Sequence, residues 1–200
     1  MTTITESFNQ TDSTTLGPDL SWTELSGTWE TKSNAVAKTV GTNQYDRARA
    51  DSDLASSDHY SQVVMAFPVG GTYHGPACRM ASDTANTFYG LVSSNSDPIS
   101  PYLIKFVAGS QTNLSSGSTA VSAGQVHKVE ANGTAIKGYF DGIETNGVTD
   151  SSIPGNVRCG FCSASAQNGG LMDSFQAADL AAPPAGGFRS RIAGGLVLVG

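Results

Sequence analysis

The sequence predicts an all-β fold of two packed antiparallel sheets. Dipeptides that tolerate the positive φ angles of tight hairpin turns recur along the chain, namely Asn132-Gly133, Asp141-Gly142, Asn146-Gly147 and Asn168-Gly169. Short segments between such turns alternate apolar and polar residues with the period of two that marks half-buried strands. Charged residues make up only 14% of the chain, and small or hydroxyl-bearing residues suit a pleated surface. Many short strands joined by polar turns are typical of a β-sandwich.

The individual strands follow from this alternation. Apolar side chains share one face in the segments 60–67, 87–93, 102–107, 157–161 and 171–176. Residues 126–131 and 134–140 lie on either side of Asn132-Gly133, and Asp141-Gly142 follows them, which predicts a β-meander. The best helix candidate, 48–57, has too little apolar periodicity to predict a helix.

The acidic composition bears on the partners. The net charge is −6 at pH 7, so the chain gains nothing from the counterion release that drives nucleic-acid binding. No apolar run is long enough to span a bilayer, and residues 1–6 lack the basic and apolar regions of a signal peptide. The three cysteines, Cys78, Cys159 and Cys162, are too few for a disulfide framework. We therefore expect no nucleic-acid partner, no membrane span, and synthesis in the cytoplasm without a signal peptide.

The chain divides into a sandwich at residues 1–180 and a linker with a C-terminal arm at residues 181–200. The linker, 181–187, holds two prolines and two glycines, which uncouple the arm from the last strand. The arm is predicted to dock on a neighbouring protein as an added strand; a frayed end is the alternative. Its expected partner-binding residues are Phe188, Arg189, Arg191, Ile192, Leu196, Val197, Leu198 and Val199.

Several motifs, taken in order, resemble the concanavalin A-like lectin/glucanase and laminin-G-like modules. They are Glu6-Ser-Phe8, the W-x-x-x-x-G-x-W pattern from Trp22 to Trp29, Ser57-Asp-His-Tyr60, and Met172-Asp-Ser-Phe175. The resemblance covers residues 4 to 180 and implies a two-sheet jelly roll. It also implies that Trp22 and Trp29 pack the core, and we expect Phe8, Phe140 and Phe175 to join them there.

Enzymatic activity is not expected. Retaining glucanases of the family carry paired glutamates in a pattern like E-x-D-x-x-E, because two carboxyl groups about 5 Å apart must act as nucleophile and acid/base. None of the five glutamates forms that motif; they are Glu6, Glu24, Glu30, Glu130 and Glu144. Asp51 and Asp53 are the nearest carboxylate pair, and a solvated loop is the favoured interpretation there.

Glu6 and Asp173 are the candidate metal ligands. Each lies two residues before a phenylalanine, so each carboxylate shares the face of that aromatic ring. Terminal strands of these sandwiches are usually neighbours, and both acids would then bind a structural Ca²⁺ together with backbone carbonyls. Hydrogen bonds from loop amides to each carboxylate are the favoured alternative. No other cofactor is expected. Cys159 and Cys162 have C-x-x-C spacing, but strand residues three apart point to opposite faces, which favours core thiols over a metal site.

Two function hypotheses follow. The first is a non-enzymatic structural or decoration protein of a particle surface, above all a phage virion (capsid or tail), assembled with other virion or surface proteins. The missing signal peptide, the apolar arm and an analogy with accessory modules of phage virions favour it. The alternative is a lectin-type module that binds a cell-surface or plant-type glycan. Its candidate residues are Tyr45, Tyr73 and Tyr102, in or beside loops.

Overall fold

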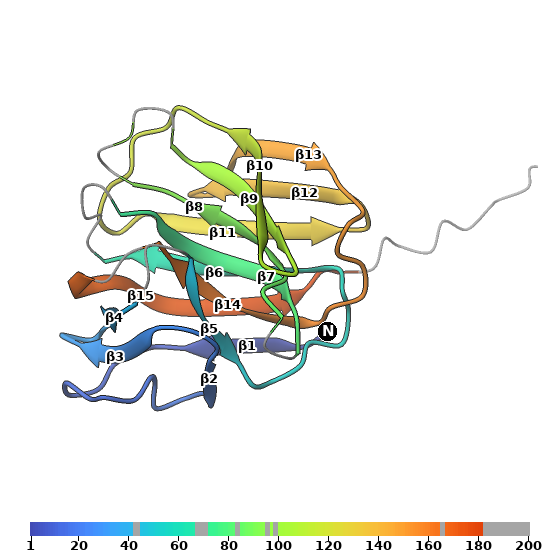
Figure 1. Ribbon diagram of the computed structural model, residues 1–200. Helices are drawn as coiled ribbons and strands as arrows, with labels where there is room; N and C mark the ends of the chain where they lie inside the picture. Colours follow the sequence, from blue (N-terminus) through green and yellow to red (C-terminus); the bar gives the residue numbers. More distant parts are fainter. Residues whose placement is uncertain are drawn as a thin grey trace, which may run out of the picture.

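The computed structural model describes residues 1–41, 45–66, 72–82, 85–94, 97, 100–164 and 167–181. Within these residues every regular element is a β-strand. The strands form two antiparallel sheets that lie face to face (Figure 1), which confirms the predicted sandwich. None of the described residues belongs to a helix of the length and apolar character needed to cross a membrane.

The larger sheet, sheet A, contains both ends of the described chain. Its strands run in the order β13 (Ile143–Thr149), β12 (Ala135–Phe140), β11 (Val126–Asn132), β6 (His59–Met65), β15 (Gln167–Asp179), β4 (Ala35–Val40) and β3 (Thr28–Lys32). The first strand, β1 (Thr3–Glu6), also pairs with β15. The N-terminal and C-terminal strands are therefore neighbours, as the family resemblance implies.

The second sheet, sheet B, covers one face of sheet A. Its strands run in the order β10 (Ser110–Ser116), β9 (Tyr102–Val107), β8 (Phe88–Val92), β7 (His74–Met80), β14 (Arg158–Ser163), β5 (Asp46–Ala50) and β2 (Trp22–Glu24). Strands β10 and β13 are thus the outermost strands at the same edge of the sandwich (Figure 1).

Two of the four predicted turns form hairpins. Gly133 has a φ of 55° between β11 and β12, and Asp141 and Gly142 have φ angles of 48° and 81° between β12 and β13. The other two turn predictions are wrong, because Asn146-Gly147 lies within β13 and Asn168-Gly169 within β15. At Asn146-Gly147, pairing with Gly138 and Lys137 of β12 overrides the local turn preference. Asn168-Gly169 falls in the irregular stretch between the paired residues Gln167 and Met172 of β15.

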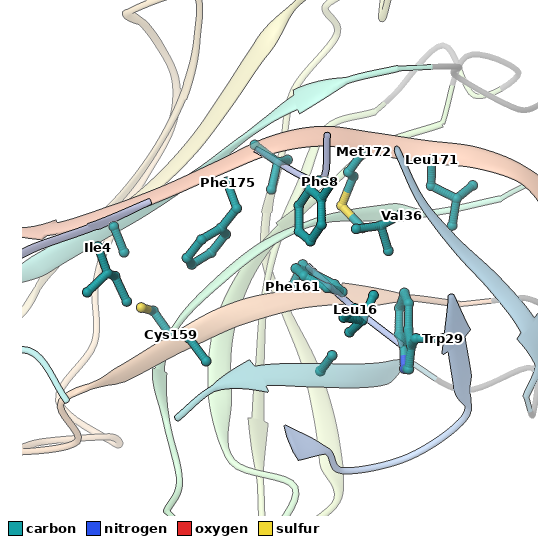
Figure 2. Packing of buried hydrophobic residues seen from close by; sticks show 14 of the residues in the cluster. Ile4, Phe8, Leu16, Trp29, Val36, Cys159, Phe161, Leu171, Met172 and Phe175 are labelled. Carbon is teal, nitrogen blue, oxygen red and sulfur yellow. The ribbon is translucent and has the colours of Figure 1, made fainter. Parts of the chain in front are cut away.

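The main core lies between the two sheets. Phe8, Trp29 and Phe161 have no exposed surface, and only 2% of Phe175 is exposed. Figure 2 shows Phe175 and Met172, which extend from β15, facing Phe161 and Cys159 on β14. The predicted core assignment of Phe8, Trp29 and Phe175 is confirmed.

The remaining core residues differ from the prediction in detail. Phe140 packs in a second cluster with Tyr89, Leu91 and Val129, while Trp22 is only partly buried against the main core. The two tryptophans also belong to different sheets, because β2 pairs with β5 and β3 pairs with β4. The W-x-x-x-x-G-x-W pattern therefore crosses from one sheet to the other and does not form a strand pair.

A buried ion pair connects the sheets. Lys38 on β4 has no exposed surface, and its Nζ lies 3.1 Å from Asp46 Oδ2 on β5 and 2.9 Å from the carbonyl oxygen of Ser163. The ammonium group also lies 6.0 Å from the centroid of the Trp29 ring. Because a buried charge must be paired and hydrogen-bonded, this arrangement constrains how the two sheets align.

Two histidines are buried in the interior without a charged partner among the described residues. On β11, His127 has Nδ1 3.1 Å from Ser93 Oγ and Nε2 3.1 Å from Gln125 Oε1. On β7, neither ring nitrogen of His74 makes a hydrogen bond of good geometry, although the backbone of Thr72 lies close by. Burial lowers the pKa of His74 to about 4, and burial together with the His74 imidazole lowers that of His127 to about 3. Both rings are therefore neutral at neutral pH.

Arg79 holds three loops at one end of the sandwich. It is 2% exposed and has a φ of 47°, which is uncommon for a residue with a side chain. Its guanidinium donates hydrogen bonds to the carbonyl oxygens of Ser57, Ile153 and Gly133 at 2.8, 3.1 and 2.8 Å, and to Asp58 Oδ1 at 3.0 Å. This single side chain therefore satisfies backbone acceptors from segments that are far apart in the sequence.

Candidate functional site

Sheet B has an outer face that is turned away from sheet A. On β9, Leu103 packs in the interior, so Tyr102, Ile104 and Phe106 point outward. On β5, Ala48 and Ala50 pack in the main core. Arg47 and Arg49 therefore also belong to the outer face.

Small residues occupy the centre of this outer face. The strand register places Arg49, Gly160, Ala77, Gly90 and Ile104 in one row across β5, β14, β7, β8 and β9. A side chain at position 160 has no room, because an ideal Cβ there would lie 2.1 Å from the carbonyl oxygen of Ala48. The centre of the row therefore carries little side-chain bulk, and the aromatic residues stand to its side.

Three tyrosines and one aspartate gather at one end of the outer face, and we call them the tyrosine cluster. Tyr45 precedes β5, Tyr73 precedes β7 and Tyr102 begins β9; all three are partly buried against the outer-face apolar residues. The rings of Tyr73 and Tyr102 meet edge to face with centroids 5.6 Å apart. Asp97 Oδ2 accepts a hydrogen bond from the Tyr102 hydroxyl at 2.9 Å and another from the Tyr73 hydroxyl.

These are the three tyrosines that the sequence singled out as glycan candidates, and the fold brings them together. Asp97, which joins two of them, was missed, because nothing in its local sequence distinguishes it from other loop aspartates. Tyr45 adds an edge-to-face contact with Phe106 at 5.7 Å. Ring contacts and hydrogen bonds therefore fix the positions of the aromatic rings and hydroxyl groups of the cluster.

The phenols of the cluster stay neutral at physiological pH. Burial raises the pKa of Tyr45, and the hydrogen bond to Asp97 raises that of Tyr73. Arg47, on the same face, has its pKa lowered by burial, but a guanidinium starts far above neutral pH and remains protonated. The face thus combines aromatic rings, neutral hydroxyl groups and a carboxylate acceptor, which together suit a polyhydroxylated ligand.

Asp51 and Asp53, the nearest carboxylate pair in the sequence, have separate partners. Asp51 Oδ1 accepts a hydrogen bond from Thr23 Oγ1 at 2.5 Å and lies 3.5 Å from Arg49 Nη2. Asp53 forms an ion pair with Arg158. The two carboxylates therefore do not face each other as a nucleophile and acid/base pair would.

Glu6 is saturated with hydrogen bonds. Its Oε1 accepts from the Phe8 amide at 3.0 Å, and its Oε2 accepts from the amides of Asp19 and Leu20 at 3.1 and 2.8 Å and from Trp22 Nε1 at 3.4 Å. A Ca²⁺ at Glu6 would have to displace these donors. Glu6 therefore accepts hydrogen bonds from loop amides, which is the alternative that the sequence favours.

Among the described residues, Asp173 accepts hydrogen bonds only from Ser174, at 2.6 Å from its amide and 3.3 Å from its hydroxyl. Glu6 pairs with Phe175, so Asp173 lies beyond the end of β1. Within the described residues, no group of three or more His, Cys, Asp or Glu side chains is arranged to hold a metal ion. Calcium binding by Glu6 and Asp173 stays a prediction.

The cysteines behave as core thiols. All three are buried and free, and burial raises the pKa of each thiol. Cys159 packs in the main core, whereas Cys162 packs on the outer face of sheet B. The predicted opposite orientation of the C-x-x-C pair is confirmed.

The predicted arm lies outside the described residues. The positions concerned are Phe188, Arg189, Arg191, Ile192, Leu196, Val197, Leu198 and Val199. Their docking on a neighbour stays a prediction.

Comparisons with known proteins give structural likenesses alone. No family model matches the chain, and no curated protein matches it. Among solved structures, the Crh5 transglycosylase in complex with NAG has a TM-score of 0.61 at 13% identity, over 88% of this chain and 84% of that chain. The carbohydrate-binding module CBM66 from Bacillus subtilis has a TM-score of 0.55 at 16% identity, over 79% and 92%. The β-glucanase of Bacillus licheniformis has a TM-score of 0.53 at 13% identity, over 89% and 98%.

These likenesses correct one prediction. The expectation that the chain is not an enzyme, which was based on the missing glutamate motif, is wrong, because a transglycosylase and a β-glucanase share this fold with a binding module and the fold does not exclude catalysis. At these identities the likenesses show the fold alone, and that fold is the one the sequence motifs resemble. The chain is a concanavalin A-like jelly-roll sandwich.

Proposed function

We propose that the chain is a carbohydrate-binding, lectin-type module that holds its ligand at the tyrosine cluster. The observation that carries the proposal is the convergence of Tyr45, Tyr73 and Tyr102 around Asp97 on the outer face of sheet B. Aromatic rings offer flat apolar surfaces for the C–H faces of sugar rings. Phenol hydroxyls and a carboxylate offer donors and acceptors for sugar hydroxyls.

The similar structures support the same choice. CBM66 is a carbohydrate-binding module, and the Crh5 transglycosylase was solved in complex with NAG. None of the similar structures described above is a virion component. The virion role rests on the C-terminal arm, which lies outside the described residues, so the glycan-binding alternative is the better supported hypothesis.

Replacing Tyr102 by Ala is expected to weaken glycan binding by about tenfold or more, because a central aromatic anchor contributes over 1 kcal/mol to binding. Binding is measured on an array of plant and cell-surface glycans, followed by titration calorimetry on the best-retained glycan. Tyr102→Phe keeps the ring but loses the hydrogen bond to Asp97, and it is expected to fall between the parent and the alanine variant.

Tyr60→Ala is the matched control, since Tyr60 is a half-buried tyrosine on the opposite, outer face of sheet A and should not change binding. Melting temperatures of all variants show that the fold is kept. If the parent retains no glycan, or if Tyr102→Ala and Tyr60→Ala bind equally, the proposal is wrong.

A further inference from the structure

A cavity of about 510 Å³ opens at the edge of the sandwich, and we call it the edge cavity. Its lining comes from the edge of the sandwich at which β10 and β13, the outermost strands of the two sheets (Figure 1), contact each other. Its lining comes from the end of β10 and the segment after it, from the β12–β13 turn, and from the start of β13. The lining includes Ser116, Gly117, Ser118, Gln125, Ile143 and Glu144.

The edge cavity and the tyrosine cluster are linked by one pair of residues in adjacent strands. Ser116 on β10 pairs directly with Tyr102 on β9, and the following segment stays attached, since the Gly117 amide donates to the Pro101 carbonyl at 2.7 Å. Directly opposed residues of an antiparallel pair project to the same side. Ser116 therefore stands beside Tyr102 on the outer face and also lines the cavity, one strand spacing of about 5 Å away.

The chemistry of the cavity suits a neutral sugar. Of the residues that the structure describes, four with hydroxyl side chains and two carboxylates, Asp141 and Glu144, line it, and no basic side chain does. Ile143 is 73% exposed and gives the mouth an apolar surface. In the described part of the chain, the Gln125 amide nitrogen has no hydrogen-bond partner, while its Oε1 faces His127. Glu144 forms an ion pair with Lys137 at 2.7 Å, whereas Asp141 has no basic partner among the described residues. The negative charge of Asp141 would repel an anionic sugar.

The oxygen of a buried amide that follows the lining residue Thr145 also lacks a hydrogen-bond partner among the described residues. Asn146 is 4% exposed, and its Nδ2 donates to Ser115 Oγ at 3.1 Å and to the Pro101 carbonyl at 3.4 Å. Its Oδ1 accepts no hydrogen bond from the described residues. This oxygen lies 3.5 Å from the place where a side chain of residue 117 would begin. An acceptor left unpaired in the interior is costly, and a ligand hydroxyl that enters beside Gly117 would satisfy it.

From these observations we infer that the edge cavity is a second sugar subsite and that the ligand is a neutral oligosaccharide. The inference rests on the proposed function. One sugar residue stacks at Tyr102, and the chain continues past Ser116 so that a further residue is held in the cavity. Affinity then depends on chain length, and the cavity selects uncharged sugars.

The test fills the cavity without touching the tyrosine cluster. Ser118 is an exposed residue of the lining, and Ser118→Trp places a large ring in the cavity. Ser110→Trp is the matched control, because Ser110 is an exposed serine at the opposite end of β10, paired with Val107. The probes are length series from mono- to hexasaccharide of neutral β-glucan, chitin, xylan and mannan, with polygalacturonate fragments as the anionic series.

The parent and Ser110→Trp are expected to bind one neutral series with an affinity that rises at least tenfold with chain length. In Ser118→Trp this rise is expected to vanish, while the affinity for the monosaccharide stays unchanged. An unaltered rise in Ser118→Trp, or a preference for the anionic series, overturns the edge subsite. If Tyr102→Ala still removes binding, that result leaves the proposed function intact. A parent that binds no series contradicts the proposed function and the subsite together.

Discussion

Replacing Trp29 by Ala is expected to lower the free energy of unfolding by about 3–5 kcal/mol, a large share of the stability of a typical domain. Trp29 has no exposed surface and packs edge to face against Phe161 with ring centroids 5.1 Å apart. Its Nε1 donates to the Ser26 carbonyl at 2.9 Å. Truncation therefore leaves a cavity between the sheets, an unpaired carbonyl oxygen and the Lys38 ammonium without the ring beside it.

The change is measured by chemical denaturation monitored by far-UV circular dichroism, since the substitution itself removes a tryptophan and would alter a fluorescence signal. Val40→Ala is the control, because Val40 is 63% exposed on β4 and its truncation should change stability by no more than about 0.5 kcal/mol. Core substitutions of this size cost several kcal/mol. A free energy of unfolding for Trp29→Ala within about 1 kcal/mol of the parent value would therefore show that this ring contributes little to the stability of the core.

The folded chain is expected to lose roughly 5 kcal/mol of stability between pH 7 and pH 4.5 through two histidines alone. Burial lowers the pKa of His74 to about 4 and that of His127 to about 3, whereas the unfolded chain keeps the ordinary value of about 6.5. Between these values the unfolded state binds more protons than the folded state. Stability is therefore fully present above pH 6.5 and falls as the pH drops, by about 1.4 kcal/mol per pH unit for each imidazole.

Between pH 6.5 and pH 4.5 the loss of stability from the histidines can be distinguished from the loss that protonation of carboxylates causes. Asp150 and Asp179 also have lowered pKa values, owing to hydrogen bonds from Lys105 and from the Thr2 amide against the opposing effect of burial. Their contribution is lost mainly below the ordinary aspartate pKa of about 4. Burial lowers the pKa of His59 as well and adds in the same direction.

His74→Leu tests the assignment, since the His74 ring nitrogens make no well-formed hydrogen bond that leucine would lose. Unfolding free energies are measured by urea denaturation at several pH values in this window. The variant is expected to match the parent at pH 8 to within about 1 kcal/mol and to show a slope that is smaller by about 1.4 kcal/mol per pH unit. Parallel slopes in the two proteins would exclude His74 as a source of the acid sensitivity.

Much of the strand pattern could be predicted from the sequence, and the failures have physical causes. Strands β6, β9, β11 and β12 alternate apolar and polar residues and were predicted within a few residues. Strand β5 was missed although Arg47-Ala48-Arg49-Ala50 alternates charged and apolar residues, because Ala and Arg are strong helix formers and Ala is depleted in strands. Strand β7 contains a glycine and a proline, and β10 is an almost wholly polar edge strand.

The sequence by itself determined the local features: the hairpin turns at Asn132-Gly133 and Asp141-Gly142, the alternation of the strands, and the burial of Phe8, Trp29 and Phe175. Only the tertiary structure decided the site. Tyr45, Tyr73 and Tyr102 meet because β5, β7 and β9 belong to one sheet, and Asp97 joins two of them from a loop. The edge cavity likewise forms where β10 of one sheet meets β13 of the other. Turn preference and alternation act between residues close in the chain, whereas strand order and sheet packing bring distant residues together, and no local pattern encodes that pairing.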